Sequence, residues 1–374
     1  MKNLSLTQQQ LLALVRLGIG SDAQADECLR QDIGWKAIVS LAEEQTVVGV
    51  VADGVQRLPE ELWPERRMRL QWFGLAAMQT EQNAVVNAAM ADLVKVLEQE
   101  QISYCIVKGQ TLGALYPNPD ARQAGDVDFY VPAGDFQHAK TLIEQRLSVK
   151  VEGEERADKH DSFVYRDVRF EMHYRLETFG ISRHQRHFDR MIDQALEVEP
   201  VTRHITDMMV RVLPPEGELV MTFKHLFNHL LMEGVGLRQL CDLLILLLHY
   251  PPAGRQRLES LLHQIGYYEA FMAMGATLVS YLGLSPERFP FTLRQKDYRW
   301  ADRLIEVPLD RGNFGKYNRK TFINQLGHKL DTAAIAFGHC LRFLPLAPSD
   351  IAGLIPTRIG IAMKMRCSVN EPTE

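Results

Sequence analysis

The sequence has few cysteines, and none of them falls in a pattern that gives cysteine a structural role. Five occur among 374 residues, at positions 28, 105, 241, 340 and 367, and no two form a C-x-x-C pair. This odd, scattered set supports neither a disulfide framework nor a zinc ribbon. Scattered free thiols are typical of a reducing compartment, so we expect a cytoplasmic protein.

Long apolar runs are also missing. The first ten residues, MKNLSLTQQQ, lack the apolar segment of a signal peptide. The most apolar run, 237–250, contains Arg238, Asp242 and His249. It is too short to span a bilayer and predicts a buried helix. We therefore expect no integral membrane segment.

Neither charge sign dominates the sequence. The 42 Lys and Arg residues against 47 Asp and Glu give a net charge of -5. This balance gives no general attraction for polyanions, so long nucleic acid is not an expected partner. Internal repeats and low-complexity tracts are absent as well. The apolar content of 46% is ordinary for a soluble globular protein with room for two or three domains.

Hydrophobic patterning divides the chain into three regions. Residues 1–100 predict helices that end in a long amphipathic helix over 66–99, in which Gln79 interrupts the apolar stripe and marks a position for a break or bend. Residues 101–200 alternate short apolar runs, typical of strands, with helical segments. Residues 201–374 return to helical patterns. The expected fold class is α+β, a small mixed-sheet core flanked by N-terminal and C-terminal helical regions.

The strongest chemical motif lies in an apolar stretch that predicts a strand over 127–131. Asp126 and Asp128 are two residues apart, and residues at that spacing on a strand project from the same face. Two neighbouring carboxylates repel each other unless a cation lies between them. Hard divalent ions such as Mg²⁺ prefer oxygen ligands, so the pair predicts a metal site.

A third carboxylate lies in a predicted hairpin made of 162–166 and 168–173. Glu171 and His173 share one face of its second arm. If that arm lies beside the aspartate strand, Glu171 joins Asp126 and Asp128, and the three can hold two Mg²⁺ ions for an in-line displacement at phosphorus. In the alternative interpretation the aspartates are loop carboxylates and Glu171 is solvated. His173 either orients a carboxylate or contacts substrate, or is an ordinary histidine at the core edge.

Two residues at the end of the preceding strand predict a phosphate-binding turn. Gly109 lies where a strand over 102–107 gives way to a helix, and free backbone N–H groups at a helix start favour an anion. Lys108, next to it, can pair with phosphate oxygens. The alternative is an ordinary turn glycine beside a surface lysine.

Two arginines have two interpretations each. Arg122 binds phosphate, or it pairs with one of the carboxylates. Arg238 reaches a triphosphate, or it forms a buried ion pair with Asp242, which lies four residues later on the same helix face.

Other candidates carry weaker signals. His225 and His229 share one helix face, but no third zinc ligand is evident. The glycine-containing loop 312–316 is interpreted as a turn between helices, with an anion-binding nest as the alternative. The basic, apolar segment 351–365 is interpreted as a docking helix, with contact to a membrane surface as the alternative.

The combination of motifs resembles a known family. The run V-K-G-x(12)-R-x-x-G-D-V-D-F, followed by F-E-M-H, resembles the uncharacterised nucleotidyltransferase family of the DNA polymerase beta-like superfamily. The match covers roughly residues 100–175, and the later segment 225–243 is similar to the helical half of that family. The resemblance implies a nucleotidyltransferase core over 101–200, Asp126, Asp128 and Glu171 as metal ligands, and Gly109 as the phosphate-binding turn. The superfamily's usual turn is Gly-Ser or Gly-Gly, whereas this chain has Lys108-Gly109.

The expected function is Mg²⁺-dependent transfer of a nucleoside monophosphate from an NTP to a hydroxyl, with release of pyrophosphate. Lys108, Gly109, Arg122 and Arg238 are the candidates that would hold the triphosphate. The acceptor is open: a small molecule, sugar, peptide, protein or RNA. Two alternatives stand beside this: a catalytically silent nucleotide-binding or partner-binding module on the same fold, and phosphoryl instead of nucleotidyl transfer.

Overall fold

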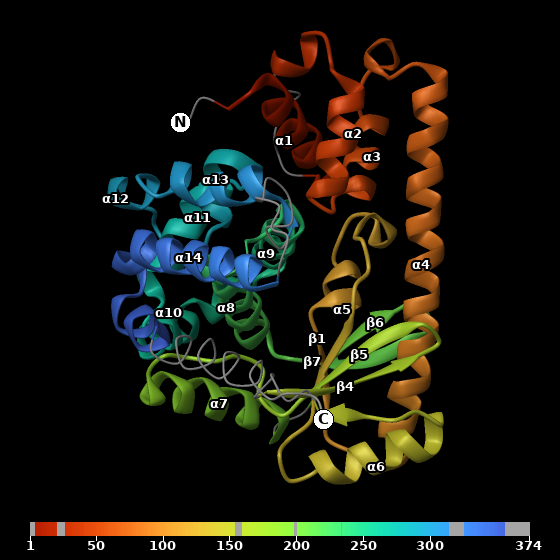
Figure 1. Cartoon of the computed structure of the whole chain (residues 1–374), viewed down its shortest axis with the longest axis vertical. Coiled ribbons are helices and arrows are strands. Elements are labelled where there is room, and N and C mark those ends of the chain that lie inside the picture. The colour runs from red at the N-terminus through yellow and green to blue at the C-terminus, as the bar shows by residue number, and fades with distance from the viewer. Residues whose placement is uncertain are drawn as a thin grey trace.

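A mixed sheet flanked by helices forms the architecture, which confirms the expected α+β class (Figure 1). The computed structural model describes residues 4–20, 27–153, 159–197, 200–232, 234–313 and 325–355. Within these ranges, no helix combines the length and apolar character needed to cross a bilayer.

The N-terminal region is helical, as its periodicity predicts. Its helices are α1 (Leu6–Ile19), α2 (Trp35–Glu44), α3 (Val48–Gln56) and α4 (Arg66–Gln99). Helix α4 runs along the length of the molecule, with α1–α3 beside its N-terminal end (Figure 1). The expected break at Gln79 is wrong, because α4 is one uninterrupted helix of 34 residues that includes Gln79. The Gln79 side chain instead donates a hydrogen bond to the Asp120 carbonyl at 2.6 Å.

The central sheet has the strand order β1-β2-β5-β4-β3. Its strands are β1 (Cys105–Val107), β2 (Val127–Tyr130), β3 (Glu152–Gly153), β4 (His160–Tyr165) and β5 (Val168–His173). Strand β2 is antiparallel to β1 and parallel to β5, so the sheet is mixed. The predicted hairpin is confirmed as β4–β5, and its two turn residues, Arg166 and Asp167, both have positive φ, as a tight hairpin turn requires.

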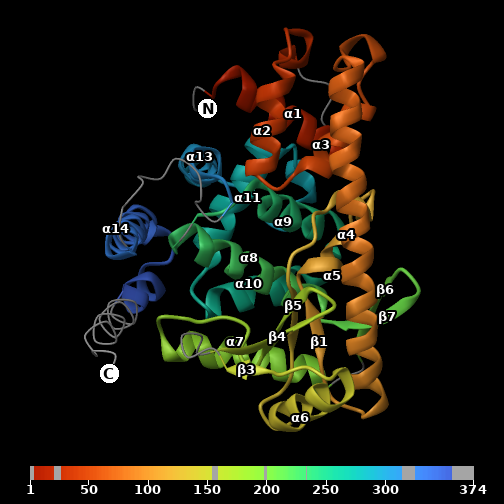
Figure 2. The same ribbon diagram turned by 45° about the vertical axis from the view of Figure 1, so that its right-hand side comes forward.

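The two faces of the sheet are different because side chains alternate along each strand. Val127, Phe129 and Phe170 belong to a core cluster that also contains α4 residues such as Met90 and Leu93. The opposite face carries Asp128 on β2 and Glu171 on β5. Figure 2 shows the sheet between α4 on one side and α8 with its neighbours on the other. The polar face is thus turned toward the C-terminal helices.

Short elements complete the core. Helices α5 (Gly109–Gly113) and α6 (Phe136–Leu147) follow β1 and β2, and α7 (Ser182–Glu197) follows β5. Strands β6 (Val201–Ile205) and β7 (Met208–Val212) then form a second, two-stranded sheet. The expectation of helical structure from residue 201 onward is wrong over this hairpin, which adds Ile205, Val210 and Val212 to the core cluster under the sheet.

The remaining chain is helical, as predicted. Its helices are α8 (Pro215–Met232), α9 (Leu237–His249), α10 (Arg255–Gln264), α11 (Tyr268–Leu282), α12 (Gln295–Tyr298), α13 (Ala301–Arg311) and α14 (Gln325–Phe343). The buried Gln45 joins the N-terminal helices to this region: it accepts a hydrogen bond from the Leu237 backbone N–H and donates one to the Pro308 carbonyl. Positions 314–316 of the loop 312–316, and positions 356–365 of the basic segment, lie outside the described residues.

Candidate functional site

The carboxylates predicted from the sequence lie on neighbouring strands. Asp128 is directly opposite Glu171 in the parallel pairing of β2 with β5, and opposite Val107 in the pairing with β1. Asp126 comes immediately before β2 and is exposed. Side chains directly opposite each other in adjacent strands project from the same face. The structure therefore brings Asp128 and Glu171 together, with Asp126 at the open edge.

Asp128 has two close polar contacts from side chains. Its Oδ1 accepts a hydrogen bond from Lys108 Nζ at 2.9 Å and lies 2.9 Å from His173 Nε2. Burial alone raises the pKa of a carboxyl, but the Lys108 ammonium and His173 outweigh burial and hold the pKa of Asp128 well below its usual range. Asp128 is therefore ionised throughout the neutral range.

Asp126 experiences the opposite effect. Although Asp126 is exposed at the surface, partial desolvation by the surrounding protein, followed by repulsion from Asp128 and Glu171, raises its pKa. The three carboxylates are therefore close enough to repel one another. Lys108 pairs with Asp128, and the Arg169 Nε lies 3.5 Å from a Glu171 oxygen, so both of these charges are partly balanced.

The Lys108-Gly109 turn lies directly beside the aspartates. Lys108 and Gly109 both have positive φ, +57° and +50°, at the point where β1 ends and α5 begins. A Cβ built on Gly109 would meet only the Asp126 carbonyl oxygen, at 3.5 Å. Glycine is therefore required by the backbone conformation at this position and not by crowding.

Arg122 forms a buried ion pair with Asp242. Its Nε donates to Asp242 Oδ1 at 2.8 Å and its Nη2 donates to Oδ2 at 2.9 Å. Tyr116 donates a third hydrogen bond to Asp242, at 2.7 Å. Asp242 on α9 is thus held by the loop before β2, and the expected ion pair between Asp242 and Arg238 is replaced by this contact.

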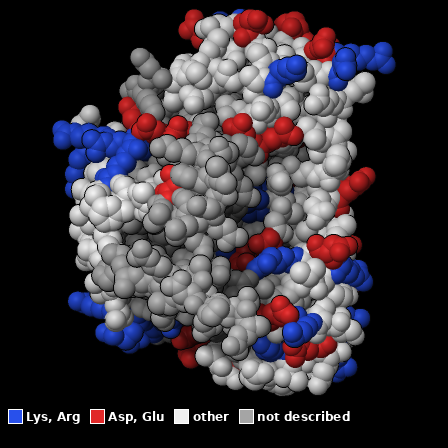
Figure 3. Space-filling model, viewed as in Figure 1, with Lys and Arg blue, Asp and Glu red and all other residues white. Residues whose placement is uncertain are grey.

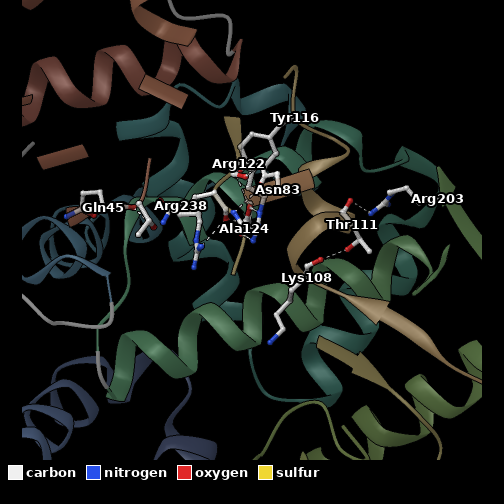
Figure 4. A network of polar contacts seen from close by, with 12 residues as sticks. Gln45, Asn83, Lys108, Thr111, Tyr116, Arg122, Ala124, Arg203 and Arg238 are labelled. Carbon is white, nitrogen blue, oxygen red and sulfur yellow. Dashed lines mark hydrogen bonds and ion pairs between the residues drawn. The ribbon is translucent and has the colours of Figure 1, made fainter. Parts of the chain in front are cut away.

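Arg238 lies close to the same loop with part of its hydrogen-bonding capacity unused. Its Nη1 donates to the Gln123 carbonyl at 3.1 Å, and its buried Nε has no hydrogen-bond partner among the described residues. A Cβ on Gly125 would lie 3.8 Å from Nη1, so the guanidinium is beside the residue that precedes Asp126. Figure 4 shows Lys108 and Arg238 extending away from the Arg122 cluster.

The loop that carries the first aspartate is anchored by α4. Asn83 donates to the carbonyls of Asp120 and Arg122, at 3.2 and 3.1 Å, and accepts from the Ala124 backbone N–H at 3.0 Å (Figure 4). Polar side chains on α4 thus hold the loop segment that leads to Asp126. From the sequence, Gln79 was only an interruption of the apolar stripe of α4, with no partner indicated.

A histidine that sequence reasoning missed also faces the carboxylates. His160 on β4 is directly opposite His173 on β5, with ring centroids 4.8 Å apart. Its Nε2 lies 3.8 Å from Glu171 Oε2, and His173 Nε2 lies 3.5 Å from the same oxygen. The predicted first arm began at residue 162, whereas β4 begins at His160, so no signal in the sequence paired His160 with His173.

A second polar group joins α8 to Glu177, which lies between β5 and α7. The buried Glu177 accepts hydrogen bonds from His225 Nδ1 at 2.9 Å and from Asn228 at 2.6 Å. His229 packs against His225, with ring centroids 4.4 Å apart. Burial and the charge on Lys108 lower the pKa of His225, so this group is within electrostatic range of the lysine that holds Asp128. The two histidines are therefore explained by Glu177 and packing.

On the face of the molecule shown in Figure 3, the described residues form no large patch of a single charge sign. Figure 3 shows acidic and basic side chains in small separate groups over the described part of that face. This agrees with the near balance of charges in the sequence.

Comparison with solved structures gives a weak likeness. One matching structure is the solution structure of the antibiotic-resistance factor ANT(2'')-Ia, with 15% sequence identity and a TM-score of 0.35. The match covers 54% of this chain and 97% of that chain. At this TM-score the likeness carries no functional weight. No curated protein sequence matches the chain.

Comparison with protein families gives a clear result. The model of a family described as uncharacterised nucleotidyltransferase matches residues 31–283, about two thirds of the chain. The matched range contains the central sheet, the Lys108-Gly109 turn, all three carboxylates and helices α8 and α9. The chain therefore belongs to the uncharacterised nucleotidyltransferase family.

Proposed function

We propose that this protein transfers a nucleoside monophosphate from an NTP to an acceptor hydroxyl and releases pyrophosphate. Family membership supports nucleotidyl transfer in general. The observation that carries the finer proposal is the pairing of Asp128 with Glu171 on adjacent strands, with Asp126 beside them. Carboxylates crowded on one sheet face have little structural use unless a cation is bound among them.

The donor set fits divalent ions. Asp126, Asp128 and Glu171 supply hard oxygen ligands of the kind that Mg²⁺ prefers, and repulsion among them favours a bound cation. Bound Mg²⁺ would neutralise the phosphate oxygens and lower the pKa of the attacking hydroxyl. The site ligands in this proposal are Asp126, Asp128 and Glu171.

The cationic side chains have separate roles in the proposed reaction. Arg238, whose Nη1 lies beside Gly125, binds the triphosphate, and the backbone at Gly109 lies next to Asp126 where a phosphate can approach closely. Lys108 orients Asp128 and adds positive charge near the phosphates. Arg122 acts through Asp242: it fixes the loop that carries Asp126 and is a positioning residue.

The proposed transfer forms a bond between the acceptor oxygen and the α-phosphorus as the bond to pyrophosphate breaks. Charge develops on the departing oxygen, where the preorganised cations Arg238 and Lys108 stabilise it. The acceptor proton leaves to solvent or to a nearby base. The proposal places the protein in a reducing, cytoplasmic compartment, where Mg²⁺ and NTPs are abundant.

A transfer screen tests the proposal. The protein is incubated with each α-labelled NTP, Mg²⁺ and a host lysate, and the products are analysed for a labelled acceptor together with pyrophosphate. Release of a nucleoside diphosphate instead would indicate phosphoryl transfer. Label that enters the same product with Asp126→Asn as with the wild type would contradict the assignment.

A thermal-shift assay separates the enzyme from a silent binding module. The enzyme predicts stabilisation by NTP that depends on Mg²⁺, because the ion bridges the carboxylates and the phosphates. Equal stabilisation by NTP with EDTA present would favour the binding module.

A further inference from the structure

The face of the sheet beside Glu171 carries two imidazoles that the proposed Mg²⁺ site does not need. His160, Glu171 and His173 offer ligand atoms that all lie within 4.8 Å of one another. His160 and His173 come from paired positions of β4 and β5, and Glu171 precedes His173 by two residues on the same face. Regular strand pairing therefore fixes the cluster, and no loop is involved in placing it.

The distances in this cluster are close to those of a coordination sphere. Glu171 Oε2 lies 3.8 Å from His160 Nε2 and 3.5 Å from His173 Nε2. Ligands of a tetrahedral ion with metal–nitrogen bonds of roughly 2.1 Å lie about 3.4 Å apart. All three ligand atoms lie within 4.8 Å of one another, so binding one ion requires them to move closer together.

His173 is placed to offer a ring nitrogen to an ion. The side chain is buried, with 1% exposure, and its Nδ1 has no hydrogen-bond partner among the described residues. Its Nε2 lies near both Asp128 and Glu171. Nε2 is therefore the atom that would bind the ion, and the two carboxylates beside it favour a cation at this position.

We infer that His160, Glu171 and His173 bind a divalent transition-metal ion, such as Mn²⁺, Co²⁺ or Zn²⁺, in preference to Mg²⁺. Imidazole nitrogen favours first-row transition metals, whereas Mg²⁺ favours oxygen donors and water. Under the proposed function this ion lies on the Glu171 side, and an ion bound by Asp126 and Asp128 accompanies the triphosphate. That catalytic role rests on the proposed transfer reaction, but the binding of the ion does not.

Pulsed electron paramagnetic resonance of bound Mn²⁺ tests this directly. Tag-free, EDTA-treated full-length protein is loaded with one equivalent of Mn²⁺, and the ¹⁴N coupling of coordinated imidazole is recorded. We expect ¹⁴N coupling in the wild type, and Mn²⁺ binding that persists in a hundredfold excess of Mg²⁺. Absence of ¹⁴N coupling in the wild type would overturn the inference, whether or not any variant folds.

Matched variants locate the ligands. His160→Gln should weaken Mn²⁺ binding at least tenfold and reduce the ¹⁴N coupling, whereas His204→Gln, at an exposed position of β6, should match the wild type. Circular dichroism confirms that each variant is folded. Binding by folded His160→Gln equal to that of the wild type would overturn the assignment of His160.

The two proposals fail separately. Nitrogen coupling without NTP turnover under any metal would remove the transfer reaction and leave the ion site. Turnover with Mg²⁺ and no nitrogen coupling would keep the transfer reaction and remove the ion site.

Discussion

The Arg122 guanidinium donates two nearly parallel hydrogen bonds to the Asp242 carboxylate, at 2.8 and 2.9 Å. The two residues are 120 positions apart, and both side chains are about 6% exposed. This bidentate contact joins the loop before β2 to α9 and so connects the sheet to the C-terminal helices. Tyr116 completes the cluster through its hydroxyl.

Breaking this pair should destabilise the protein strongly. Asp242→Asn leaves the Arg122 charge buried without its counter-ion, which costs about 3–5 kcal/mol. Urea unfolding measures the change in the free energy of unfolding. Lys150→Ala serves as control, because Lys150 pairs with Glu152 at an exposed position, and its loss should cost less than about 0.5 kcal/mol. Equal stability of Asp242→Asn and the wild type would remove the structural role of the pair.

Gly109→Ala should cost stability through the backbone alone. The φ of +50° is unfavourable for alanine by roughly 1–2 kcal/mol, while the nearest atom to an added Cβ is 3.5 Å away. Gly134→Ala is a suitable control, because nothing lies within 4 Å of a Cβ there and its φ is not positive. Thermal unfolding of the two variants gives the comparison, and equal melting temperatures would contradict the strained conformation at Gly109.

Arg238→Met should separate stability from nucleotide binding. The Arg238 Nε has no hydrogen-bond partner in the described part of the chain, and burial lowers the pKa of the guanidinium. An apolar side chain of similar length should therefore change the free energy of unfolding by less than about 1 kcal/mol. The KM for NTP should rise roughly tenfold or more, because a charge-assisted phosphate contact is lost. Steady-state kinetics with varied NTP checks this. An unchanged KM would remove Arg238 from the triphosphate site.

The buried group on α8 predicts loss of stability in mild acid. Burial and the Lys108 charge lower the pKa of His225, and burial and His225 lower the pKa of His229, so both rings are neutral in the folded protein. In the unfolded chain they bind protons near pH 6.5. Their contribution is therefore complete above about pH 6.5 and falls as the pH drops toward their folded pKa values.

Glu177 adds a contribution of the same sign at lower pH. Burial raises its pKa, but Lys159 and His225 outweigh burial and hold the pKa well below its usual value. Its contribution is present above about pH 4.3 and is lost as the pH falls through the folded pKa.

Urea unfolding from pH 8 to pH 5 tests the contribution of the two histidines. Stability should fall in the wild type and in the control His204→Gln, and it should fall less in His229→Gln. Stability that rises toward pH 5 would contradict the lowered pKa values of His225 and His229.

Local sequence patterns were sufficient to predict the parts of the fold that depend on local structure. Alternation in 168–173 predicted β5 and the face shared by Glu171 and His173, and this face is the one that carries Asp128. The β6–β7 hairpin was missed because Arg203, His204 and Arg211 interrupt its apolar pattern. Ile205, Val210 and Val212 pack against the core under the sheet, a tertiary contact that the local pattern does not reveal.

Contacts between distant segments could not be predicted in the same way. The i,i+4 spacing on α9 favoured a pair between Arg238 and Asp242, but Asp242 binds Arg122 from a loop far away in the sequence. Spacing identifies residues on one helix face and leaves their tertiary partners undetermined. His160 was missed for the same reason, since only the β4–β5 register places it beside His173.

The most direct test of the acidic site is pyrophosphate release from NTP and Mg²⁺ by Asp128→Asn, compared with Asp207→Asn. Asp207 is exposed in the β6–β7 turn, so the control removes the same charge away from the sheet face. We predict that Asp128→Asn remains folded and loses at least a thousandfold of the wild-type rate, while Asp207→Asn retains it. Wild-type pyrophosphate release by Asp128→Asn would contradict the account.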